Sequence, residues 1–167
     1  MTPTPALPAR ESGAAADTQP ADPVTPGSVA AETAGPAAPA WVTATTFLAA
    51  DVLRDPRSQQ AREALATLTG ADSREQICAL EAMEQLRHDR QGFRPTRLSP
   101  HAFRNAVYKE GMIQVTAGAV RSNRIWYEIA YRCRLDAGGQ TIIGFEYALG
   151  APVDRALWDE YGLAPVY

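Results

Sequence analysis

Apolar and polar side chains alternate along much of residues 113–149, and turn signals divide this stretch into segments of strand length. The alternation is strictest in residues 125–135. One face of a strand there would carry Ile125, Tyr127, Ile129, Tyr131, Cys133 and Leu135, and the other would carry Trp126, Glu128, Ala130, Arg132 and Arg134. This pattern predicts an antiparallel sheet with one dry face and one wetter face.

The turn signals predict the number and order of the strands. We expect strands over residues 103–109, 112–121, 125–135 and 140–149, because they are separated by Glu110-Gly111, Ser122-Asn123 and Asp136-Ala137-Gly138-Gly139. Strands joined by such short turns lie next to each other in the sheet. The expected sheet is therefore a three- to four-stranded antiparallel meander.

Apolar residues at helical spacing lie mostly before the sheet. We expect a short helix within residues 41–54, capped by Thr45 or Thr46, and a second helix over residues 58–68. The best helix should run over residues 72–87, with Asp72 as the cap of a capping box. We interpret residues 89–100 as a connection and expect a short C-terminal helix over residues 154–161. Helices first and strands afterwards predict an α+β fold, with the N-terminal helices packed on one sheet face.

Composition divides the chain near residue 40. Residues 1–40 contain no aromatic residue and consist largely of Pro, Ala and Thr, so we expect a disordered Pro/Ala-rich linker before a single α+β domain over residues 41–167. The linker holds Arg10 and four acidic residues, which leaves the domain 15 basic and 15 acidic residues of the chain's 16 and 19. A neutral domain has no global field that would favour nucleic acid or an anionic membrane.

The sequence contains no motif that assigns a chemistry. We find no nucleophile elbow, P-loop, dinucleotide fingerprint or metal-binding helix, so we expect no catalytic residue, no cofactor and no metal. No apolar run is long enough to span a bilayer, and no secretory signal or anchor follows Met1. On the residues alone, a cytoplasmic location therefore stays open.

The only two cysteines are Cys78, on the best predicted helix, and Cys133, on the dry face of the central strand. A bridge between them would close a loop whose entropy is worth ~4 kcal/mol in the chain-entropy model. Two buried reduced thiols are the alternative, because a bridge needs an oxidising compartment.

Acidic and basic side chains supply several candidate binding residues. Glu81 and Glu84 stand three apart on the best helix, where paired carboxylates can do acid–base work, although a solvated helix face is the simpler reading. Arg121, Trp126 and Arg132 belong to the wetter sheet face, and Trp and Arg often carry binding energy at interfaces. The alternative, which we favour for Trp126, is that the C-terminal helix and Trp158 cover it and make it part of the core. A basic connector, which would bind phosphate, acidic glycan or lipid headgroups or simply be solvated, contains Arg87, Arg90, Arg94, Arg97 and Arg104.

Two blocks of sequence resemble the family known as domain of unknown function 930, over about residues 72–163. The first block is Gln76-Ile77-Cys78-Ala79-Leu80-Glu81-Ala82-Met83-Glu84-Gln85. The second comprises Gly118-Ala119-Val120-Arg121-Ser122 and Trp126-Tyr127, followed by Cys133, Phe145, Gly150, Pro152 and Trp158. The family occurs mainly in alphaproteobacteria such as the rhizobia, often behind an anchor or export segment and a Pro-rich spacer, and has no assigned activity. The resemblance therefore implies a periplasmic or envelope-associated location and favours a Cys78–Cys133 disulfide.

The leading hypothesis is a non-enzymatic binding or structural module of the cell envelope, carried on the Pro/Ala-rich linker. Its partner would be another envelope protein or an anionic envelope component, and nucleic acid is not expected. The alternative is a small-ligand-binding protein or an enzyme, with a pocket between helix and sheet lined by Tyr127, Tyr131, Tyr147 and Glu81. The residues expected to bind a ligand or partner are Arg121, Trp126, Tyr127, Arg132 and Glu81.

Overall fold

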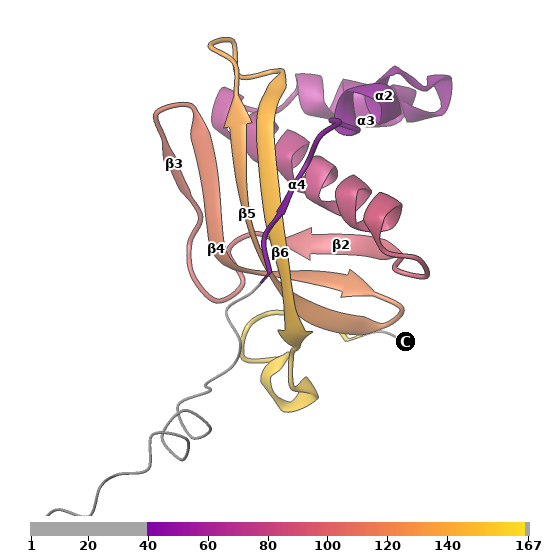
Figure 1. Cartoon of the computed structure of the whole chain (residues 1–167), viewed down its shortest axis with the longest axis vertical. Coiled ribbons are helices and arrows are strands. Elements are labelled where there is room, and N and C mark those ends of the chain that lie inside the picture. The colour runs from indigo at the N-terminus through magenta and orange to yellow at the C-terminus, as the bar shows by residue number, and fades with distance from the viewer. Residues whose placement is uncertain (1–39, 166–167) are drawn as a thin grey trace, which may run out of the picture. The chain divides into compact units, whose positions relative to one another are not determined.

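The computed structural model describes residues 40–165, which form several helices and one antiparallel sheet (Figure 1). The elements are β1 (Val42–Thr43), α2 (Ala49–Arg54), the 3₁₀ helix η1 (Pro56–Ser58), α3 (Gln59–Ala66), α4 (Gly70–Asp89), β2 (Pro95–Ser99), β3 (Val107–Lys109), β4 (Met112–Ser122), β5 (Ile125–Leu135), β6 (Ile142–Pro152) and the 3₁₀ helix η2 (Arg155–Leu157). The six strands follow the order β1-β6-β5-β4-β2, and β3 also pairs with β4. The α+β class is confirmed, whereas the predicted sheet of three to four strands was too small.

The predicted linker, residues 1–40, lies outside the described residues except for Ala40. The boundary of a single domain at residue 41 therefore stays a prediction.

The long strands β4 and β5 cover the residues predicted for them, whereas β6 is shifted and begins two residues later than predicted and ends three later. The alternation along β5 separates the two faces. Tyr131, Cys133 and Leu135 are buried in the core beneath α4. The pattern differs at the start of the strand, where Ile125 is 40% exposed and Trp126, expected on the wetter face, is 1% exposed. Both differences arise because the sheet bends, so that its two halves face different layers.

The bend lies in the middle of β4, whose second half turns away from the first (Figure 1). The register between β4 and β5 shifts between Val115 and Gly118, and β3 pairs with the first half of β4 while β2 pairs with the second. A Cβ at Gly118 would lie 2.9 Å from Val115 Cγ1 and 3.1 Å from the carbonyl oxygen of Ser99. Glycine therefore allows β2 and β4 to approach at this corner.

A second, smaller core covers the face opposite α4 beyond the bend. It contains Ala119, Trp126, Val153, Trp158 and Leu163. The helix predicted over residues 154–161 is only the 3₁₀ turn η2, which Asp154 caps by accepting a hydrogen bond from the backbone N–H of Ala156 at 3.0 Å. The indole N–H of Trp126 donates to the carbonyl oxygen of Ala164 at 3.0 Å, so the C-terminal segment seals this core.

Two edge strands occupy residues for which other structure was predicted. β1 pairs Val42 with Tyr147, within the region expected to be helical, and the helix α2 begins only at Ala49. β2 lies in the expected connection and pairs Leu98 with Val120. Strands of two to five residues carry too few alternating positions for the period to show. The strand expected over residues 103–109 is likewise shorter, since β3 begins at Val107.

The predicted cap of the longest helix was one turn too late. α4 spans Gly70–Asp89, and its N-cap is Thr69, whose hydroxyl oxygen accepts a hydrogen bond from the backbone N–H of Asp72 at 3.2 Å. The same hydroxyl donates to Oδ2 of Asp72 at 2.8 Å. Asp72 therefore supports the first turn from within it rather than preceding it.

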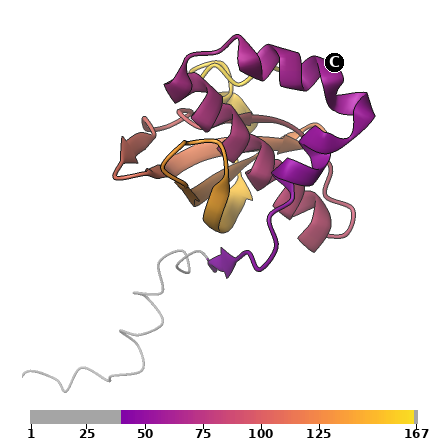
Figure 2. The same cartoon turned by 90° about the horizontal axis from the view of Figure 1, so that it is seen from above.

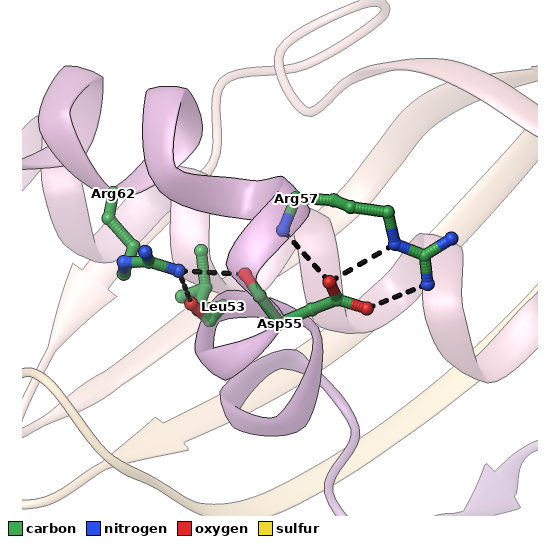
Figure 3. A network of polar contacts seen from close by, with 4 residues as sticks. All are labelled: Leu53, Asp55, Arg57 and Arg62. Carbon is green, nitrogen blue, oxygen red and sulfur yellow. Dashed lines mark hydrogen bonds and ion pairs between the residues drawn. The ribbon is translucent and has the colours of Figure 1, made fainter.

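The helices α2 and α3 pack against α4 and are joined by a polar network (Figures 2 and 3). The carboxylate of Asp55 accepts a hydrogen bond from the backbone N–H of Arg57 at 2.9 Å and pairs with the Arg57 guanidinium. These hydrogen bonds lower the pKa of Asp55 to about 2. The guanidinium of Arg62 donates to the carbonyl oxygens of Leu53 and Asp55 where α2 ends. Direct packing of α2 and α3 on the sheet stays a prediction.

A disulfide joins α4 to the sheet. The Cα atoms of Cys78 and Cys133 are 5.9 Å apart, their sulfur atoms are bonded at 2.07 Å, and both residues are fully buried. The surrounding core includes Ile77, Ala82, Leu86, Val115, Ile129, Tyr131 and Phe145. The predicted bridge is confirmed, and it connects positions separated by 55 residues.

We expect removal of this disulfide to destabilise the fold. The double variant Cys78→Ala, Cys133→Ala should lose ~4 kcal/mol of the free energy of unfolding, because the unfolded chain regains the entropy of the open loop. Urea titration of the full chain would measure the loss. Reductant should lower the wild-type midpoint towards that of the variant and leave the variant unchanged, and a wild-type midpoint indifferent to reductant would contradict the expectation.

Candidate functional site

The sheet face opposite α4 carries an aromatic and charged cluster on β1, β5 and β6. Arg132 of β5 alternates with Tyr131 and Cys133, so its side chain lies on the face away from α4. The guanidinium carbon of Arg132 lies 4.2 Å from the ring centre of Trp41, and Arg132 Nη1 lies 2.5 Å from Oε1 of Glu146 on β6. Trp41 is 39% exposed. We call these residues, Trp41, Arg132 and Glu146, the open-face cluster.

The residues beside the open-face cluster leave an accessible strip across three strands. Gln114 of β4 pairs directly with Arg132, and Arg134 pairs with Gly144 of β6. Arg134 is exposed, and its closest polar contact is with the sulfur of Met112 at 3.9 Å. Arg134 has no carboxylate within ion-pair distance among residues 40–165. The strip therefore presents two cations. Glu146 pairs with Arg132, whereas no described carboxylate pairs with Arg134.

The other sheet residues expected to bind a partner do not join this cluster. Arg121 lies beyond the bend, where its Nε donates to the Thr96 hydroxyl at 3.1 Å and its guanidinium lies 5.7 Å from the ring of Trp126. Trp126 is buried in the second core, as the sequence favoured, so it is not part of the accessible surface. Tyr127 is half-buried towards α4 and packs on Phe93 with ring centres 5.3 Å apart. Alternation alone places residues on a face and does not show which half of a bent sheet is covered.

Glu81 is fully buried, and both oxygens of its carboxylate accept hydrogen bonds from within the fold. Its Oε2 accepts hydrogen bonds from the backbone N–H groups of Leu48 at 3.0 Å and Ala49 at 2.7 Å, and its Oε1 accepts one from Gln85 Nε2 at 2.6 Å. These are the first N–H groups of α2, whose own N-cap residue supplies no side-chain bond. Glu81 therefore replaces the predicted caps Thr45 and Thr46, and Glu84 pairs instead with Arg87.

We expect Glu81→Gln to lower the free energy of unfolding by about 3 kcal/mol, because the amide cannot accept all the hydrogen bonds that the buried carboxylate accepts. Glu84→Gln is the matched control on the same helix and should change stability by less than about 1 kcal/mol, since its ion pair with Arg87 reaches the surface. Thermal and urea unfolding would measure both. Equal losses for the two variants would contradict the capping role.

A pocket opens where the C-terminal end of α4 meets β1. Its volume is about 410 Å³, and it is lined by Val42, Thr43, Ala44, Thr45, Thr46, Leu48, Gln85, His88, Asp89, Arg90 and Tyr147. Of the four residues predicted to line a pocket between helix and sheet, only Tyr147 lines this one. Tyr131 is buried and stacks on Phe145 with ring centres 5.6 Å apart. The pocket was predicted between helix and sheet, and it lies at the C-terminal end of α4.

Three ionisable side chains are connected by hydrogen bonds at this pocket. The Tyr147 hydroxyl donates to Oδ2 of Asp89 at 2.7 Å, and His88 Nδ1 lies 2.9 Å from Oδ1 of the same carboxylate. The bonds from Tyr147 and His88 lower the pKa of Asp89. Burial and the bond to Asp89 raise the pKa of Tyr147, an effect that nearby Arg90 partly opposes. Asp89 is therefore held as a carboxylate and Tyr147 as a neutral phenol at neutral pH.

We expect Tyr147→Phe to cost about 1 kcal/mol at neutral pH, because Asp89 loses a hydrogen bond. The raised pKa of Tyr147 means that the unfolded chain ionises first as the pH rises above 10.0, so wild-type stability falls there and the variant lacks this loss. The difference in the free energy of unfolding between wild type and Tyr147→Phe should therefore become smaller above pH 10. Urea midpoints at neutral and alkaline pH would test this, with Tyr108→Phe on the exposed strand β3 as the control, and a constant difference would contradict it.

The basic connector does not act as one cluster in the structure. Arg87 pairs with Glu84 and donates to the carbonyl oxygen of Pro95 at 3.0 Å, whereas Arg90 lines the pocket. His101 pairs with Glu75 and accepts the backbone N–H of Ala106.

Comparison with known proteins identifies one family. Residues 65–163 match the family described as Domain of Unknown Function (DUF930). No curated protein and no solved structure matches the chain. Among residues 40–165, no helix combines the length and apolar composition that crossing a membrane requires, and no group of three or more His, Cys, Asp or Glu side chains is placed to hold a metal ion.

Proposed function

The chain belongs to the family described as Domain of Unknown Function (DUF930), and we propose that it is a non-enzymatic binding module of the cell envelope. The observation that carries the proposal is the open-face cluster, in which an exposed tryptophan stacks on an arginine of a sheet face that no other described segment covers. Trp and Arg contribute most of the energy at many interfaces, and their stacking orients both before a partner arrives.

The charge of this face favours a partner with acidic groups. Glu146 balances Arg132, whereas Arg134 is exposed without a carboxylate partner in the described part of the chain. A carboxylate placed over Arg134 would gain charge-assisted hydrogen bonds. The partner we propose is an envelope protein with an acidic surface, whose apolar contacts would be with Trp41 and Met112.

The buried disulfide supports the envelope location. Structural disulfides persist in oxidising compartments such as the periplasm and are rare in reducing cytosol. Cys78 and Cys133 are both fully buried in the main core, so their bond is part of the fold. An alphaproteobacterial source and an export route remain part of the proposal that rests on the family resemblance.

We expect a photo-crosslinking residue at position 114 to capture the partner in the native host. Gln114 lies directly beside Arg132 in the sheet, so a crosslinker there would contact anything bound to the open-face cluster. Mass spectrometry would identify the adduct. The added variant Arg132→Glu should abolish it, because the central cation is replaced by a repelling charge.

The matched control is a crosslinker at Gln60, an exposed position of α3. It should give no adduct that depends on Arg132. Identical adducts from positions 60 and 114, or an adduct at 114 that survives Arg132→Glu, would reject the open face as the binding surface. An adduct with lipid or glycan in place of protein would reject the protein partner.

Small-ligand binding is the second candidate function. The observation that favours it is the pocket at the end of α4, since about 410 Å³ falls within the range of small-molecule sites.

A further inference from the structure

We infer that the pocket at the end of α4 binds a small carboxylate with a short apolar body, and that Arg90 binds the carboxylate group. This inference rests on the second candidate function, small-ligand binding, and adds the chemical class of the ligand. It concerns the side of the sheet that carries α4, so it is independent of the open-face cluster.

Arg90 is the arginine of the pocket lining, and it interacts with the Tyr147 hydroxyl and with the charge of Asp89 without forming an ion pair. It lines the cavity near the Tyr147 hydroxyl, and no carboxylate among residues 40–165 lies within ion-pair distance of it. A guanidinium offers five N–H donors in a planar fork that matches a carboxylate. An anionic ligand would supply the ion-pair partner that residues 40–165 do not.

The acidic group of the pocket is already occupied. Oδ2 of Asp89 accepts the Tyr147 hydroxyl at 2.7 Å, and Oδ1 faces His88 Nδ1 at 2.9 Å. A cationic ligand would have to compete with both contacts, whereas an anionic ligand would use Arg90 without breaking either. The remaining lining groups of α4 do not offset this preference, because Gln85 already donates to Glu81 and to the carbonyl oxygen of Thr46.

The strand β1 adds further hydrogen-bond donors along one wall. The backbone N–H of Ala44 donates to the carbonyl oxygen of Phe145 at 2.9 Å, so the N–H group of the alternate residue Thr43 points away from β6. β1 is the last strand on this side of the described sheet. This N–H group and the hydroxyls of Thr45 and Thr46, which line the cavity, suit the oxygens of a carboxylate.

The apolar part of the lining limits the rest of the ligand. Val42, Ala44 and Leu48 line the cavity beside its polar groups. They would contact a short hydrocarbon or aromatic body, and burial of its apolar surface is favourable for binding. A purely polar anion such as inorganic phosphate would leave this wall without contacts.

The test compares three probes of equal length and different charge: hexanoate, hexylamine and 1-hexanol. Each is titrated into the ¹⁵N-labelled full-length protein, and amide shifts give both the location and the affinity. Hexanoate should shift the amides of residues 43–46 and of Arg90, and should bind more tightly than the other two probes. Arg90→Gln should weaken hexanoate about tenfold, because it removes a charge-assisted contact. Arg97→Gln, an exposed arginine of β2 away from the pocket lining, is the matched control and should leave hexanoate affinity unchanged.

The contrary results distinguish a failure of this inference from a failure of small-ligand binding itself. Equal or tighter pocket binding of hexylamine or hexanol would overturn the carboxylate class and leave small-ligand binding standing. Shifts from none of the three probes at the pocket would overturn both. If Arg90→Gln and Arg97→Gln weakened hexanoate binding equally, the cause would be a general charge effect, and the role of Arg90 would be overturned.

Discussion

The contact between α4 and the sheet is the constraint on which the other features of this protein depend. The disulfide lies at its centre, so the helix is fixed on the strands covalently as well as by burial of apolar surface. Three side chains of α4 then reach three different elements. Cys78 bonds to β5, Glu81 caps α2, and Asp89 holds the hydroxyl of β6's Tyr147. One rigid helix thus sets the position of the sheet, the preceding helix and the pocket.

The bend of β4 and β5 explains how a small sheet supports two cores. The first half of β4 and the second half of β5 lie under α4, whereas the second half of β4 and the first half of β5 are covered on the opposite face by the C-terminal segment. The outer face of the first half of β4 and the second half of β5 is left uncovered by the described residues. That face carries the open-face cluster, because no helix or terminal segment among the described residues covers Arg132.

Local periodicity predicted the parts of the fold that are long and regular. The strands β4, β5 and β6 and the helix α4 each repeat their period often enough to be found from the sequence, and the two cysteines lay on the faces that meet. The edge strands β1 and β2 are defined by partners far along the chain, so their own residues carry little signal. The roles of Glu81 and Trp126 depend on segments more than 30 residues away, Leu48 for the first and Ala164 for the second. The pocket could not be foreseen for the same reason, since it forms where β1 meets the end of α4.

Two adjacent residues at the start of β1 lie on opposite sides of the sheet. Trp41 precedes the strand and stacks on the uncovered face, while Val42 faces the other way and forms part of the pocket wall. A shortened chain that starts after this strand would therefore lose residues of both proposed binding surfaces, even if the core around the disulfide folded unchanged. Any minimal version of the protein has to retain these few residues to remain a fair test of what it binds.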